Sequence, residues 1–205
     1  MNCRTIINIL MPLLLSGCVN SESNQDKKNK DYFQVLNRFN IELVNHFPRK
    51  INVEIFSTNY TKKIENNDVS LIHYEYDVDL NDLKKTLEFV LKKKKAFYQS
   101  NDTCLLIIND YKEKEINELK KDSSCIKYCN PIPRFVNIKN PVKSNPTLLN
   151  SQYCIYVLDS SPNKYFRDFQ LKPNPRMPES WKNGYSKGIA INKTERTIIY
   201  WVTIW

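Results

Sequence analysis

The sequence predicts an α+β domain, a mostly antiparallel sheet with helices on one face. Segments whose apolar residues recur at helical spacing are interspersed with segments in which every second residue is apolar. The strand-like segments are short, and the last two are close enough in sequence to pair as a hairpin. Residues 31–205 have the length of a single domain, and neither a repeat nor an internal linker divides them.

The first half of this domain contains the clearest patterns. A helix is expected over 31–47, because its apolar residues fall on one helical face and Pro48 follows. Residues 51–55 and 69–80 alternate like half-buried strands, and we expect them to form a hairpin around a polar loop at 59–68. A strong helix is predicted over 80–98, capped by Asp79, with Lys92–Lys95 near its C-terminus, where the helix dipole favours cations.

The second half is less regular. We expect a buried strand at 104–108, a short charged helix at 111–121 and a strand at 153–158. Prolines make most of 123–147 and 163–180 irregular. Residues 188–192 and 196–205 are predicted to form a terminal hairpin. Its last strand is apolar on both faces, which is typical of a covered, central strand.

The N-terminus has the composition of an export signal. Arg4 precedes an apolar run, residues 5–15, that is too short to span a bilayer. Leu15, Ser16, Gly17 and Cys18 follow, an order that resembles the lipobox of bacterial lipoproteins. The resemblance implies that a peptidase removes residues 1–17 and that acyl chains attached to Cys18 hold the protein on a membrane. An ordinary cleaved signal or a buried N-terminal helix is the alternative.

The lipoprotein resemblance also implies a location and a linker. Residues 18–30 are polar after the cysteine and are expected to form a flexible tether. Residue 19 is Val, whereas Asp at this place retains enteric lipoproteins in the inner membrane. We therefore expect the outer membrane rather than the inner one. The chain carries a formal net charge of +9, which favours binding to anionic lipids or acidic polymers. Nucleic acid is not an expected partner, because the protein is predicted to be exported.

Glycine content excludes several enzyme classes. The chain has three glycines, and Gly17 leaves with the signal. Phosphate-binding loops, dinucleotide-binding motifs and the serine elbow of α/β-hydrolases each need closely spaced glycines, because the backbone must turn sharply or approach the ligand. No cofactor is therefore predicted.

Four cysteines remain in the domain after removal of the signal: Cys104, Cys125, Cys129 and Cys154. An even number in an exported chain predicts two disulfides, in any of three connectivities, with Cys104–Cys154 a plausible pair. Buried free thiols are the alternative. The spacing between Cys125 and Cys129 lacks a matching second pair, so no zinc site is predicted.

Acidic residues near Asp77 give two candidates for a site. Asp77, Asp79, Asn81 and Glu88 have the spacing of calcium-loop ligands, but the position that needs glycine is Asp82. On a strand, His73, Glu75, Asp77 and Asp79 would share one face, which could bind a metal or form an acid–base pair. A solvated sheet face has the same pattern and is commoner, so no metal site is predicted. His46, beside Phe47, is expected to pack or to cap a helix.

Two further features suggest surfaces. Lys92–Lys95 could contact anionic headgroups or an acidic partner, although such a run is usually a solvated helix face. Aromatic residues near the C-terminus could stack on a sugar or anchor an interface, although core packing is the main alternative. The candidate ligand surface comprises Trp181, Tyr185, Trp201 and Trp205.

These observations favour a non-catalytic, membrane-tethered binding protein with a protein partner, such as an envelope-complex subunit or a tethered toxin-neutralising (immunity) protein. A surface module that binds a glycan or a small ligand is the second hypothesis, based on the aromatic residues. An enzyme, which would have to use His73 with Glu75 or Asp77, is the third.

Overall fold

The computed structural model describes residues 24–63, 68–102, 105–110, 130–135, 147–163 and 171–205. A six-stranded sheet in the order β1-β2-β6-β5-β4-β3 forms its centre, and every neighbouring pair is antiparallel. The strands are β1 (Phe56–Lys63), β2 (Asp68–Glu75), β3 (Ala96–Gln99), β4 (Cys154–Ser161), β5 (Tyr185–Asn192) and β6 (Thr197–Ile204). The helices are α1 (Asn24–Leu36), α2 (Ile41–Val44), α3 (Leu80–Lys93) and the short 3-10 helix η1 (Glu179–Trp181). This architecture confirms the predicted α+β class.

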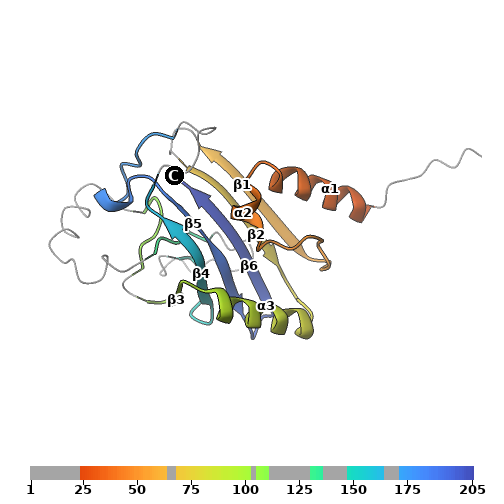
Figure 1. The fold of residues 1–205 in the computed structure, drawn as a ribbon. Coiled ribbons are helices and arrows are strands. Elements are labelled where there is room, and N and C mark those ends of the chain that lie inside the picture. Colours follow the sequence, from red (N-terminus) through yellow and green to blue (C-terminus); the bar gives the residue numbers. More distant parts are fainter. Residues whose placement is uncertain (1–23, 64–67, 103–104, 111–129, 136–146, 164–170) are drawn as a thin grey trace, which may run out of the picture.

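The three α-helices lie on the same face of the sheet (Figure 1). Tyr32 and Leu36 of α1, Leu43 of α2 and Val90 of α3 belong to one buried apolar cluster with alternate residues of β2, β5 and β6. Helix α3 connects β2 to β3, which is at the far edge of the sheet, and so passes the strands between them (Figure 1). Its predicted cap is confirmed, because the Asp79 side chain accepts a hydrogen bond from the Asn81 backbone N–H at 2.8 Å.

Irregular segments cover the opposite face. Leu105, Ile107, Ile132, Phe135 and Leu149 pack with the residues of β2, β4, β5 and β6 that point away from the helices. The segments join at one parallel bridge between Ile107 and Ile132. With cover on both faces, the sheet is the middle of three layers.

The terminal hairpin is confirmed. Strands β5 and β6 pair from Tyr185↔Ile204 to Asn192↔Thr197. Every residue of β6 is buried, because the strand lies between β2 and β5 and both of its faces are covered. The apolar residues on both faces of this segment therefore predicted its central position correctly.

Several boundaries differ from the prediction. The single helix expected over 31–47 is two helices, and Asn40 caps the second by accepting from the Glu42 N–H at 3.0 Å. The apolar residues that suggested one helix are still buried in the same core. Their spacing therefore indicated which residues are buried, but not that the helix is continuous. Residues 24–30, expected in the flexible tether, are part of α1, and Asn29 Oδ1 accepts from the Ile51 N–H at 3.1 Å.

The first strand was placed wrongly. Residues 51–55 are not a strand, and β1 instead occupies much of the segment predicted as a polar loop. As an edge strand with partly buried side chains, β1 lacks the apolar alternation of a strand over a core. Of the predicted strand at 104–108, residues 105–108 are described, and Ile107 forms the isolated bridge to Ile132. The predicted helix at 111–121 lies outside the described residues.

Candidate functional site

The most enzyme-like arrangement is a row of three polar side chains on β1 and β2. Thr58 Oγ1 lies 2.8 Å from His73 Nδ1, and His73 Nε2 lies 3.6 Å from Glu75 Oε1. A hydroxyl, an imidazole and a carboxylate in this order match the roles of nucleophile, base and orienting acid. Sequence reasoning paired His73 with Glu75 but missed Thr58, because β1 was expected to be a loop.

Access rules out catalysis by this row. His73 is fully buried, and the ring centroids of Tyr32, Phe56 and Tyr200 lie 4.8, 5.9 and 6.1 Å from its own. Burial, and then the nearby Glu75 carboxyl, raises the pKa of Tyr200, so its phenol stays protonated. A substrate atom cannot come within hydrogen-bonding distance of the imidazole without removal of α1. The row is therefore a buried polar contact that fixes β1 and α1 against β2.

The polar side chains expected to share one strand face do not do so. His73 and Glu75 point into the helix-side core, and β2 ends at Glu75. Asp77 is exposed with a positive φ of 54°, and Asp79 caps α3. The solvated face expected for these residues is therefore wrong at His73 and Glu75. Within the described ranges, no three His, Cys, Asp or Glu side chains are placed to share a metal ion.

The second histidine also lies in the core. His46 Nε2 is 3.0 Å from the Trp201 carbonyl oxygen, and the side chain is almost fully buried. Burial, with a smaller effect from the Lys187 charge, lowers its pKa to about 3. The imidazole is therefore neutral at pH 7 and donates to the carbonyl, a packing role of the kind predicted from its place beside Phe47.

A groove of about 380 Å³ opens where β2 leads into α3, and it borders the β5–β6 turn. Its wall is partly apolar, from Val53, Ile55 and Tyr76. Its charged residues are Glu54, Asp77, Asp79, Asp82 and Arg196. Two of its carboxylates are paired: Asp77 Oδ1 lies 3.5 Å from Arg196 Nη2, and Asp82 Oδ1 lies 3.0 Å from Lys85 Nζ. The acidic side chains still outnumber these two cations, so the groove remains acidic. The residues with the spacing of calcium ligands thus belong to the segment after β2 and to the cap of α3, beside this groove. Glu88, the last of them, does not line the groove.

The aromatic residues near the C-terminus do not form an exposed surface. Trp201, Trp205 and Tyr185 are 0%, 1% and 5% exposed, and only Trp181 is half-buried. The Trp205 indole N–H donates to the Trp181 carbonyl oxygen at 2.7 Å, and the two rings are 6.0 Å apart. The candidate ligand surface therefore has one accessible ring, and the burial favours the core-packing alternative.

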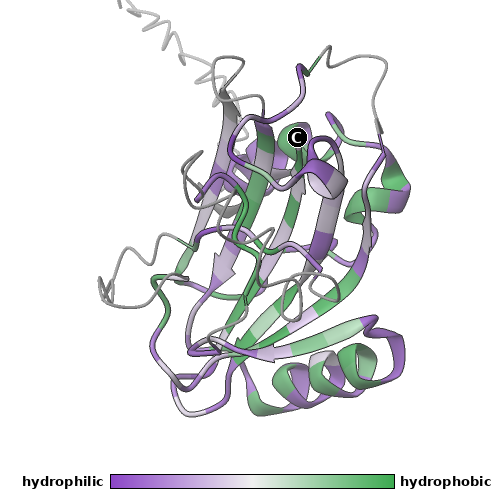
Figure 2. Ribbon diagram, turned by 90° about the vertical axis from the view of Figure 1, so that its left-hand side faces the viewer, coloured by the Kyte–Doolittle hydropathy of each residue, from purple (hydrophilic) through white to green (hydrophobic). Residues whose placement is uncertain are grey.

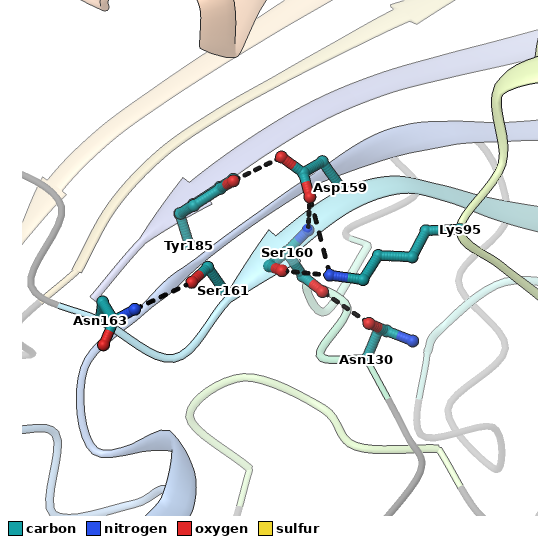
Figure 3. Close-up of polar contacts among 7 residues, drawn as sticks. All are labelled: Lys95, Asn130, Asp159, Ser160, Ser161, Asn163 and Tyr185. Carbon is teal, nitrogen blue, oxygen red and sulfur yellow. Dashed lines mark hydrogen bonds and ion pairs between the residues drawn. The ribbon is translucent and has the colours of Figure 1, made fainter.

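A polar network that the sequence did not suggest lies on β4 and β5 (Figure 3). The Tyr185 hydroxyl donates to Asp159, and Lys95 Nζ lies 3.7 Å from the same carboxylate and donates to the Ser160 carbonyl oxygen at 2.6 Å. The Ser160 hydroxyl donates to Asn130 Oδ1 at 2.6 Å. The network surrounds an irregularity in β4 between Val157 and Asp159, and it ties the end of α3 to the sheet.

Of the four cysteines in the predicted disulfides, the structure describes Cys154. Cys154 is half-buried with a free thiol, and its Sγ lies 3.7 Å from Gln99 Nε2. The other predicted partners, Cys104, Cys125 and Cys129, lie outside the described residues, as does Cys18. The predicted pairing with Cys154 is not formed in this structure, and the remaining connectivity stays a prediction.

Comparison with protein-family models, curated proteins and solved structures gives no match. No helix within the described part of the chain has the length and apolar character needed to cross a membrane.

Proposed function

We propose that this chain is a membrane-anchored lipoprotein of the cell envelope, in the outer rather than the inner membrane, that binds a protein partner without catalysis. The N-terminal pattern that ends at Cys18 supports the anchor. The observation that carries the non-catalytic role is the burial of His73, because Tyr32 covers the arrangement of hydroxyl, imidazole and carboxylate that His73 forms with Thr58 and Glu75. An envelope-complex subunit and an immunity-like protein both fit this description.

The groove beside Asp77 is the surface that we expect the partner to use. Ile55 is 47% exposed there, next to carboxylates of Asp77, Asp79 and Asp82. An apolar contact surrounded by acidic groups suits a basic side chain with a long aliphatic stem, such as Lys or Arg in a partner loop. A protein surface offers such a group together with the additional contact area that a stable complex needs.

The test is a pull-down of the full-length lipoprotein from mildly solubilised native membranes, with quantitative mass spectrometry of associated proteins. We expect one near-stoichiometric protein partner. The double variant Asp77→Asn/Asp82→Asn should retain about 5- to 30-fold less of it, because each exposed ion pair contributes up to about 1 kcal/mol.

The matched control is Glu88→Gln/Glu179→Gln, which removes two exposed carboxylates outside the groove. It should retain the partner like the wild type. An empty pull-down with the wild type would contradict the protein-binding role. Equal retention by both double variants would contradict the assignment of the groove.

A further inference from the structure

The C-terminal part of α3 and the start of β3 expose apolar and basic side chains that are close in sequence. Phe89, Leu91 and Phe97 are 41%, 50% and 44% exposed. Lys92, Lys93 and Lys94 lie between them in the sequence and are also exposed. These six residues form what we call the basic apolar patch. Figure 2 shows α3 along the bottom of the molecule, with hydrophobic and hydrophilic residues in turn along it.

The patch is positively charged. Lys94 Nζ lies 5.9 Å from the centroid of the Phe97 ring, so that cation and ring are neighbours on the surface. Lys95 is bound to Ser160 and Asp159 and stands apart from the patch. Glu88 is the one acidic residue in the last two turns of α3. Neither Lys92 nor Lys93 forms an ion pair with another residue of the described ranges.

The predicted anchor places a membrane within a short tether of the start of α1. Cys18 lies six positions before Asn24, the first residue of α1. Six fully extended residues span at most about 20 Å. Helices α1 and α3 are on the same face of the sheet (Figure 1), so the layer that contains the patch is the one to which the anchor connects.

From the patch and this short connection we infer that the basic apolar patch rests on the anionic headgroups of the membrane that Cys18 anchors. Leucine and phenylalanine side chains enter the interface between headgroups and acyl chains, while lysines beside them contact lipid phosphates. An acidic protein could meet the same charge, but the proposed anchor already brings the chain to a membrane, whose anionic headgroups need no separate encounter. The inference deepens the proposed function, since it uses the proposed lipid anchor to say which face turns to the membrane.

Vesicle binding tests the patch separately from the anchor. The mature chain from residue 18, with Cys18→Ser so that no acyl chain is attached, is sedimented with vesicles of phosphatidylglycerol and phosphatidylcholine or of phosphatidylcholine alone. We expect binding to the anionic vesicles that weakens at high salt. Lys92→Gln/Lys93→Gln should lower the partition coefficient about 25-fold, because each lysine near an anionic surface strengthens binding about fivefold.

Two controls use the same chemical changes elsewhere. Lys172→Gln/Lys193→Gln removes two exposed charges outside α3 and should change binding little. Leu91→Ser should weaken binding, whereas Leu80→Ser, at the other end of α3 and 65% exposed, should not. Circular dichroism of each variant confirms folding. Absence of binding, equal binding to both vesicle types, or an equal loss in a patch variant and its control would overturn the inference.

Failure here can be told apart from failure of the proposed function. The vesicle assay needs no lipid on Cys18 and no protein partner, whereas the pull-down needs no contact by the patch. A chain that captures its partner but ignores anionic vesicles would refute the patch alone.

Discussion

Trp201→Ala should destabilise the protein strongly, because the indole is a centre of the core on the side away from the helices. The side chain is 0% exposed, and the Phe135 ring lies edge-on to it at 5.4 Å between centroids. The indole also lies directly against the Gly188 backbone, where an added Cβ would be 2.4 Å from two of its ring atoms. Removal of a buried tryptophan costs about 3–5 kcal/mol. At about 2–4 °C per kcal/mol, the Tm should fall by roughly 6–20 °C.

The assay is urea and thermal unfolding of the mature Cys18→Ser chain, followed by circular dichroism, with and without the substitution. Trp181→Ala is the matched control, because Trp181 is half-buried and should contribute less. A loss below about 1 kcal/mol for Trp201→Ala would refute the core assignment, since surface substitutions fall in that range. Loss of glycan binding with intact stability would instead support the ligand-surface hypothesis.

Two further predictions concern residues that contact Trp201. Gly188→Ala would place a Cβ 2.3 Å from the Tyr156 carbonyl oxygen and 2.4 Å from the indole, so thermal unfolding should show a loss of about 1–3 kcal/mol that is less than additive with Trp201→Ala. For His46, burial lowers the pKa from 6.5 to about 3. Over this pH range the unfolded chain therefore binds a proton that the folded chain does not bind. The free energy of unfolding falls as the pH falls from about 6.5 towards 3. Between pH 7 and pH 5 the wild type should lose about 2 kcal/mol more than His46→Gln in urea unfolding, and parallel pH profiles would show that His46 titrates normally.

The sequence predicted those helices and strands whose buried residues recur at a regular spacing along the segment. The apolar residues on both faces of 196–205 identified a central strand, and the stripe on 80–98 identified α3 with Asp79 as its cap. The same reasoning failed for β1, because an edge strand has one neighbour and little need for apolar residues. It also joined α1 and α2, since both helices bury residues against the same core.

The candidate site could not be predicted in the same way, because its contacts join residues that are distant in the sequence. His73 and Glu75 alternate with Ile72 and Tyr74 as they would on a solvated sheet, and only the position of Tyr32 shows that both faces are covered. The Lys95–Asp159 pair joins residues 64 positions apart, and the Thr58–His73 contact required the correct placement of β1. The acidic groove combines residues from three separate segments, which sequence spacing alone does not bring together.

The membrane anchor underlies both the proposed partner binding and the contact of the basic apolar patch with lipid. Intact-mass spectrometry of the chain purified from its native membrane fraction tests that anchor most directly. We predict a chain that begins at Cys18 and carries the added mass of a diacylglycerol, with or without a further acyl chain, and we predict that Cys18→Ser abolishes this modification. A membrane-bound chain that retains residues 1–17, or one with an unmodified Cys18, would contradict the account.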